Sequence, residues 1–181
     1  MKFINNIKEG IGRKILKIKT KSLERNKQAF SFDKARTAGI LLNAKDVKTF
    51  ELTQTFIKFI RSKDIETLSF GYVDDEKVIS AYDYQIGMDH FTKKQLNWYN
   101  KPIGLSIEQF ISKEFDILID LTLDEFFPVQ YIVGISRAKF KVGRFISDNS
   151  YYDMMIDIEK KNTLEYLIEQ ITHYLLLINP K

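Results

Sequence analysis

The segment Phe115-Asp116-Ile117-Leu118-Ile119-Asp120-Leu121 carries the strongest strand signal in the chain. Apolar residues run through it almost without interruption, which is typical of a strand buried on both faces of a parallel sheet. Residues 124–137 have the pattern of a helix, with Pro128 in the first turn, where its missing N–H is tolerated. Because 139–145 has the pattern of a further strand, the three elements predict a βαβ unit with 115–121 as a central strand.

The same alternation continues on both sides of this unit. Strands are expected at 37–42, 67–73 and 78–81, in an extended stretch up to Phe91, and at 152–158. Helices are expected after the N-cap candidates Asp46, Thr92, Ser106 and either Asn162 or Thr163. This alternation predicts an α/β fold, with a mostly parallel sheet and helices on both faces in a Rossmann-like three-layer arrangement.

Length and composition fit one folded unit of this class. The chain has 181 residues, 44% of them hydrophobic, so it can bury one sizeable core. We expect a single α/β domain at 31–181 behind an N-terminal segment at 1–30. No cysteine is present, which excludes disulfides and thiolate metal sites and fits a cytoplasmic protein. No apolar stretch approaches the roughly 20 residues that span a bilayer, so neither a transmembrane segment nor an export signal is expected.

The N-terminal segment predicts a basic amphipathic helix. Five isoleucines recur at steps of three and four and fall within one narrow stripe of a helix: Ile4, Ile7, Ile11, Ile15 and Ile18. Residues 1–30 hold nine Lys or Arg against Glu9 and Glu24, a local charge of +7, whereas the rest of the chain sums to −3. Gly10 and Gly12 each weaken the helix by roughly 1 kcal/mol relative to Ala, so it is expected to form against a surface.

Three surfaces are candidates for that role. The helix could pack on the chain's own domain with its lysines solvated, its isoleucines could enter an anionic membrane leaflet, or its lysines could bind RNA such as a ribosomal surface. The absence of Trp and of a Leu-rich face favours RNA slightly over a membrane. The cations expected to contact an anionic partner are Lys8, Arg13, Lys14, Lys17, Lys19 and Lys21. The pattern predicts no particular oligomeric state.

A second candidate region follows the predicted strands. Ligands of open α/β sheets bind beyond the carboxyl ends of the strands, which favours Asn43, Asp120, Thr122 and Asp124 as ligand-binding residues. The order Asp120-Leu121-Thr122-Leu123-Asp124 departs from the Asp-x-Asp-x-Thr pattern of aspartate-nucleophile phosphatases. The structural alternative is that Asp124 and Glu125 only favour a helix N-terminus through its dipole.

Several cofactor and catalytic patterns are missing from the sequence. The turn at 42–46 has no glycine to admit a dinucleotide, and the Gly-Lys-Ser/Thr signature of a nucleotide-binding loop does not occur. His90 has no carboxylate or serine at a recognisable spacing, and His173 falls opposite the apolar stripe of its helix and is expected to be solvated. We therefore nominate no catalytic residue, no metal site and no cofactor.

Two mixed patterns have structural explanations. Trp98 and Tyr99, with lysines nearby, resemble a platform for single-stranded nucleic acid, but aromatic residues near a loop are expected at the edge of a core. Lys139 and Lys141 alternate, and Arg144 follows them, which is typical of an edge strand that avoids pairing with other chains.

Residues 114–121 and Ile135-Ser136-Arg137-Ala138-Lys139-Phe140-Lys141-Val142-Gly143-Arg144-Phe145 resemble part of the N-terminal half of heptosyltransferases of glycosyltransferase family 9. In those enzymes the segment is a βαβ piece of the acceptor-side Rossmann-like domain. A second domain, which this chain is too short to contain, holds the activated sugar. The resemblance therefore implies the fold and carries over no catalytic residue. The whole chain also resembles an uncharacterised bacterial domain family of similar length.

Two functional hypotheses follow from these patterns. The leading one is a non-enzymatic binding or accessory protein whose basic N-terminal segment docks on an anionic partner. The alternative is a small glycosyltransferase-like or nucleotide- or sugar-binding enzyme that uses the carboxyl ends of the strands.

Overall fold

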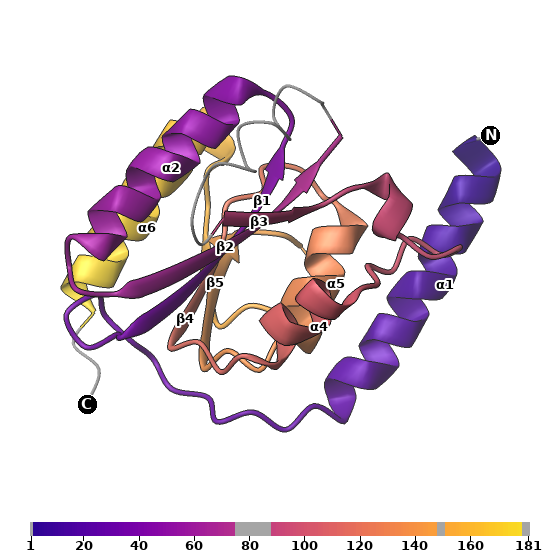
Figure 1. The fold of residues 1–181 in the computed structure, drawn as a ribbon, viewed down its shortest axis with the longest axis horizontal. Coiled ribbons are helices and arrows are strands. Elements are labelled where there is room, and N and C mark those ends of the chain that lie inside the picture. The colour runs from indigo at the N-terminus through magenta and orange to yellow at the C-terminus, as the bar shows by residue number, and fades with distance from the viewer. Residues whose placement is uncertain (1, 75–87, 148–150, 179–181) are drawn as a thin grey trace.

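The central sheet has six strands in the order β3-β2-β1-β4-β5-β6 (Figure 1). The computed structural model describes residues 2–74, 88–147 and 151–178. All pairings between the described strands are parallel. The strands are β1 Thr37–Ala44, β2 Glu66–Val73, β3 Met88–Phe91, β4 Ile117–Asp120, β5 Phe140–Arg144 and β6 Met154–Ile156. The direction of strand order therefore reverses between β1 and β4, which makes this pair the topological switch point of the sheet.

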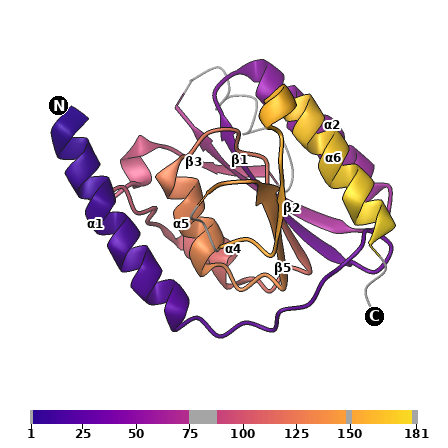
Figure 2. The same ribbon diagram turned by 180° about the vertical axis from the view of Figure 1, so that it is seen from behind.

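Helices cover both faces of the sheet, and one more helix lies outside them. α2 (Val47–Arg61) and α6 (Leu164–Leu177) lie on one face, and α4 (Leu105–Ser112) and α5 (Phe127–Ile135) lie on the other (Figure 1, Figure 2). α1 (Lys2–Lys21) lies beyond α5, on the side away from the sheet. The predicted α/β class, with a parallel sheet between helices and a preceding basic helix, is confirmed.

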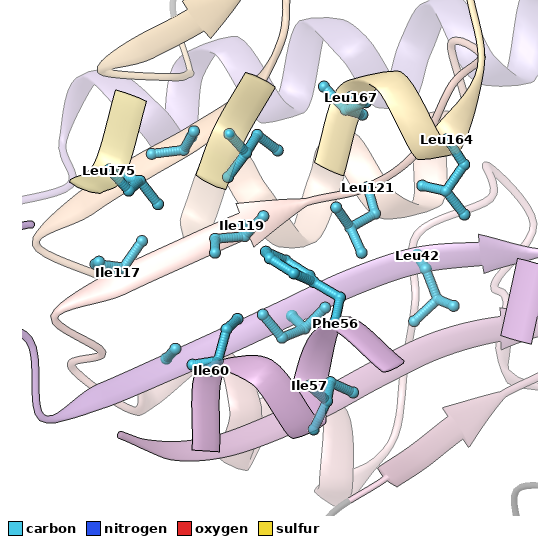
Figure 3. Packing of buried hydrophobic residues seen from close by; sticks show 14 of the residues in the cluster. Leu42, Phe56, Ile57, Ile60, Ile117, Ile119, Leu121, Leu164, Leu167 and Leu175 are labelled. Carbon is cyan, nitrogen blue, oxygen red and sulfur yellow. The ribbon is translucent and has the colours of Figure 1, made fainter. Parts of the chain in front are cut away.

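The two faces of β4 enter two different cores, which explains the unbroken apolar pattern of its sequence. Ile117 and Ile119 pack toward α2 and α6, where they join residues such as Phe56 and Leu167 (Figure 3). Leu118 belongs to the second core, beneath α4 and α5. Because successive side chains of a strand point to opposite faces, a strand that is covered on both sides needs apolar residues at every position.

Several predicted helix starts are confirmed by their caps. The Asp46 carboxylate accepts a hydrogen bond of 2.7 Å from the Thr49 backbone N–H and begins α2. Thr163 caps α6 in the same way, accepting from the Tyr166 N–H. Thr92 caps only the short 3-10 helix η1 (Lys93–Gln95), and a second 3-10 helix, η2 (Glu159–Lys161), precedes α6. Side chains that satisfy the first free N–H groups thus mark these helix starts in the sequence.

Three expectations were wrong in detail. α4 begins at Leu105 instead of after Ser106, because Gly104 adopts a φ of 139° and turns the chain into the helix earlier. α5 begins at Phe127, later than residue 124, since Phe126 is still extended with φ of −123°. β5 is not an edge strand: it pairs with both β4 and β6, and Lys141 is buried. The strand expected at 78–81 lies outside the described residues.

The segment between α1 and β1 is fixed to the body of the protein. The Arg25 Nη1 donates to the carbonyls of Ala138 and Lys139, at 2.9 and 3.1 Å. Further along, Phe32 is buried and its backbone N–H donates to the Leu175 carbonyl at 3.0 Å. These contacts hold the end of α1 in place and limit how far the helix can move from the sheet.

Candidate functional site

The α1 helix packs on the body through the face opposite its isoleucines. Gly12 and Leu16 are buried, whereas Ile7, Ile11 and Ile18 are 50, 37 and 69% exposed. At about 100° per residue, the Gly12 and Leu16 face points well away from the isoleucine stripe. The helix therefore packs on its own domain while Ile7, Ile11 and Ile18 of the stripe stay exposed and Ile15 is half-buried.

Two glycines allow α1 and α5 to approach closely. A Cβ atom at Gly12 would lie 2.6 Å from the Phe127 ring, and one at Gly134 would lie 2.8 Å from the Leu16 side chain. Leu16, Phe127 and Tyr131 form a small buried cluster between the two helices. Gly12, which weakens the isolated helix, is thus required for the contact that holds it.

Arg13 is bound within the protein. Its guanidinium donates to the Glu9 carboxylate at 2.7 Å and to the Gln130 Oε1 at 2.7 Å, and it lies 3.7 Å from the Glu125 carboxylate. Arg13 is one of the cations predicted to contact an anionic partner, and the structure places it in the seam between α1 and α5 instead. Lys8, another of those cations, is half-buried.

The remaining predicted cations are exposed. Lys14, Lys17, Lys19 and Lys21 all face solvent on α1. At about 100° per residue, Lys14, Lys17 and Lys21 flank one side of the isoleucine stripe and Lys19 lies on its other side. We call the exposed set Ile7, Ile11, Ile18, Lys14, Lys17 and Lys21 the outer face of α1. It combines an apolar stripe with adjacent positive charge and no acidic residue.

The second candidate region lies at the switch point between β1 and β4. A hollow of about 190 Å³ opens there, and three of the four predicted ligand-binding residues line it: Asn43, Thr122 and Asp124. The Lys45 ammonium is paired with the Asp124 carboxylate at its edge, and both side chains are largely exposed. The parallel sheet brings these residues together from two separate parts of the chain.

Asp120, the fourth predicted residue, does not line this hollow. It is buried behind it, where its carboxylate accepts hydrogen bonds from the Tyr152 hydroxyl at 2.5 Å and the Thr122 N–H at 2.8 Å. Burial raises the pKa of Asp120 above its ordinary value, although the hydrogen bonds from Thr122 and Tyr152 oppose the shift. Burial and the neighbouring carboxylate also raise the pKa of Tyr152. The pair joins β4 to the segment before β6.

Two wider hollows lie along the same edge of the sheet. One, of about 390 Å³, is lined by residues 43–45 with Tyr72 and Asp74. The other, of about 380 Å³, holds Arg144 among acidic residues that include Glu125 and Asp157. In the described part of the chain, no group of three His, Asp or Glu side chains is placed to hold a metal ion.

The aromatic and histidine residues singled out in the sequence lie apart from these hollows. Trp98 is exposed, so the expected place at the edge of a core was wrong for this residue, whereas Tyr99 is half-buried. The two rings contact edge-on, with centroids 5.1 Å apart. His173 is exposed, as predicted. None of the described helices combines the length and apolar character needed to cross a membrane.

The chain belongs to DUF6913, a family of unknown function, which matches residues 8–178. This confirms the resemblance to an uncharacterised domain family. No curated protein matches the chain. No solved structure matches it either.

Proposed function

We propose that the protein is a binding or accessory protein that attaches to an anionic membrane surface through the outer face of α1. The observation that carries this proposal is the exposure of Ile7, Ile11 and Ile18 on a helix whose opposite face is already packed on α5. A single exposed isoleucine needs no explanation, but three in one stripe leave apolar area without a partner. The lysines beside the stripe supply the positive charge that an anionic surface attracts.

The geometry favours a lipid surface over RNA as the partner. RNA offers phosphates to lysines but no apolar layer for isoleucines, whereas an anionic leaflet accepts both in one plane. Each basic residue near such a leaflet contributes about 1 kcal/mol. Lys14, Lys17 and Lys21 lie next to the stripe and form no ion pair with the part of the chain that the structure describes. The slight sequence preference for RNA is therefore reversed.

Co-sedimentation with vesicles tests the proposal. Binding is expected with vesicles of phosphatidylcholine and phosphatidylglycerol and not with phosphatidylcholine alone. Changing Lys14, Lys17, Lys19 and Lys21 to Glu should abolish binding, because it replaces attraction by repulsion. A matched variant with Lys58, Lys93, Lys94 and Lys160 changed to Glu has the same net charge and should still bind. Equal binding by both variants would reject the outer face of α1.

A second variant separates lipid from RNA. Changing Ile7, Ile11 and Ile18 to Ser removes apolar area from exposed positions and leaves every lysine in place. We expect it to lose vesicle binding by roughly tenfold or more, since each buried CH₂ contributes about 0.8 kcal/mol. Its matched control changes Val47, Leu105 and Leu177, which are exposed elsewhere. Ribosome or RNA binding that survives the isoleucine changes, without any vesicle binding, would identify RNA as the partner.

The hollows at the carboxyl edge of the sheet support a second candidate function. Asn43, Thr122 and Asp124 converge on one hollow at the switch point, where ligands of this architecture bind. A nucleotide or sugar site there would agree with the resemblance of 114–145 to heptosyltransferases. Thermal-shift measurements with nucleotides and nucleotide sugars test it, because a bound ligand stabilises the folded protein. No shift at high ligand concentration would reject this candidate.

A further inference from the structure

A hollow of about 200 Å³ lies where the end of α1 meets the last turn of α5 and strand β5. It is at the opposite edge of the sheet from the switch point, because α5 starts at the carboxyl edge and runs back. Among the described residues, four basic side chains and no acidic one line it; this lining is Thr20, Lys21, Leu23, Arg25, Lys27, Gly134, Lys141 and Tyr151. The hollow therefore presents an excess of positive charge in a confined space.

Lys141 is the most unusual of these residues. Its side chain is only 2% exposed, yet no ion pair joins its ammonium to a carboxylate among the described residues. The Nζ donates to the carbonyls of Val133 and Gly134, at 2.6 and 3.3 Å, in the last turn of α5. These carbonyls satisfy two of its three N–H groups, but they carry no net charge. The positive charge of Lys141 is therefore not balanced locally.

The acidic residue that acts on Lys141, Asp153, is already engaged. Asp153 is ion-paired with Arg25, and its other oxygen accepts from the Lys141 backbone N–H at 2.9 Å. Burial lowers the pKa of Lys141 to about 7, and the cations of Arg25 and Lys27 act in the same direction against Asp153. One carboxylate thus faces several cations, and the site lacks negative charge.

We propose that this hollow binds the phosphoryl group of a small phosphorylated molecule. A tetrahedral dianion would accept hydrogen bonds from lysine and arginine donors and neutralise the excess charge. The volume suits a phosphoryl group with a small attached moiety, since pockets for drug-sized ligands span about 300–1,000 Å³. Lys21 and Thr20 come from α1, so a bound anion would also fix α1 against the body. The hollow and the outer face of α1 share only Lys21, so the variants that test the hollow leave this residue unchanged.

Sulfate and phosphate are the probes for the first test. Titration calorimetry at constant ionic strength should detect binding of both anions to the wild-type protein and no comparable binding of chloride. Sulfate stays dianionic across pH 6.5–8.5, so its affinity reports on the protein. The charged groups around Lys141 are Lys21, Arg25, Lys27 and Asp153, with the Tyr151 phenol, whose pKa burial raises. Sulfate should bind roughly tenfold more weakly at the upper pH, because Lys141 has then lost its proton.

Two variants and a control decide whether the hollow is the site. Lys141→Met keeps the side-chain length and removes the charge, and it should lose sulfate binding while retaining a cooperative thermal transition. Lys27→Gln changes only the exposed rim and should weaken binding by roughly threefold to tenfold, which keeps the test valid if Lys141→Met fails to fold. Lys94→Gln, an exposed lysine elsewhere, should bind as wild type does. Wild-type affinity in both pocket variants, or no anion binding by the wild type, would overturn the proposal.

Competition against bound sulfate distinguishes a soluble phosphorylated ligand from a lipid headgroup. Glycerol 3-phosphate should compete with sulfate more strongly than vesicles containing phosphatidic acid if the natural ligand is soluble. Stronger competition by the vesicles would place a lipid headgroup in the same hollow. Either result supports the site and assigns its ligand.

Discussion

The carboxyl edge of the sheet and the α1 side of the molecule both carry charged residues, but they differ in how those charges are balanced. At the carboxyl edge, Lys45 is paired with Asp124, and Arg144 lies in a hollow whose lining includes Glu125 and Asp157. On the α1 side, the Lys141 ammonium pairs with no carboxylate of residues 2–74, 88–147 and 151–178, and the outer face of α1 has no acidic residue. A charge that the protein's own chain leaves unbalanced is a stronger indication of a partner than a favourable place in the fold.

Replacement of Lys141 should give the largest effect on stability. Its folded pKa, about 7, is lower than that of the unfolded chain, so between pH 7 and 9 only the unfolded chain holds the proton. The unfolding free energy of the wild type should rise in this range by up to about 1.4 kcal/mol per pH unit from this group. Lys141→Met should lack that rise. Urea unfolding of both proteins at pH 7, 8 and 9 measures the difference. If the unfolding free energies of wild type and variant changed equally with pH, Lys141 would not be buried as described.

Asp120 should show the opposite dependence. Its folded pKa is raised, so above pH 4 the folded protein holds a proton that the unfolded chain releases. The carboxyl therefore lowers stability as pH rises from 4 toward its folded pKa, by up to about 1.4 kcal/mol per pH unit. Asp120→Asn keeps an acceptor for Tyr152 and should flatten this part of the profile. An unchanged profile in urea unfolding from pH 4 to 7 would contradict the buried placement of Asp120.

Two glycines in α1 form a matched pair with opposite expectations. Gly12→Ala should lower the unfolding free energy by about 1–3 kcal/mol, because its Cβ would overlap Phe127 in the contact with α5. Gly10→Ala has nothing within 4 Å and should raise stability by up to about 1 kcal/mol through helix propensity alone. Thermal unfolding and hydrogen exchange in α1 would measure both. Equal effects of the two changes would mean that α1 does not pack on α5.

The smallest effect is expected at the carboxyl edge. The pair of Lys45 and Asp124 is exposed at both side chains, so Lys45→Ala should change the unfolding free energy by less than about 1 kcal/mol. High salt should remove even that difference, because exposed charges are screened. Urea unfolding at low and high salt provides the measurement. A larger, salt-resistant loss would show that this pair organises the switch point.

The fold was predictable because its deciding patterns are local. The apolar run at 115–121 predicted a central strand, and Asp46 and Thr163 predicted helix starts through caps that need only neighbouring residues. Strand order was not predictable, since it depends on pairings between distant segments. This is why Lys141 was expected on an exposed edge and was found buried in β5.

The face through which α1 packs on the domain could not be predicted from the sequence pattern either. Five isoleucines predicted the helix correctly, but only Leu16 indicates an apolar contact on the other side, and Gly12 was understood as a weakness. The rule that ligands bind beyond the carboxyl ends of parallel strands selected Asn43, Thr122 and Asp124, and these three residues line one hollow at the switch point. Asp120 does not line that hollow, because it still belongs to β4 and shares a strand face with Leu118, which packs beneath α5.

The burial of α5 on every side has a practical consequence. All of its residues except Ile135 are buried, among them Phe127, Val129 and Tyr131, so water meets almost none of this helix. We predict that the α/β domain begins at residue 31. A shortened protein that starts there would expose aromatic rings of α5, a helix that has no polar face to meet solvent. We expect such a protein to self-associate, which would make the first thirty residues a condition of solubility as well as a means of attachment.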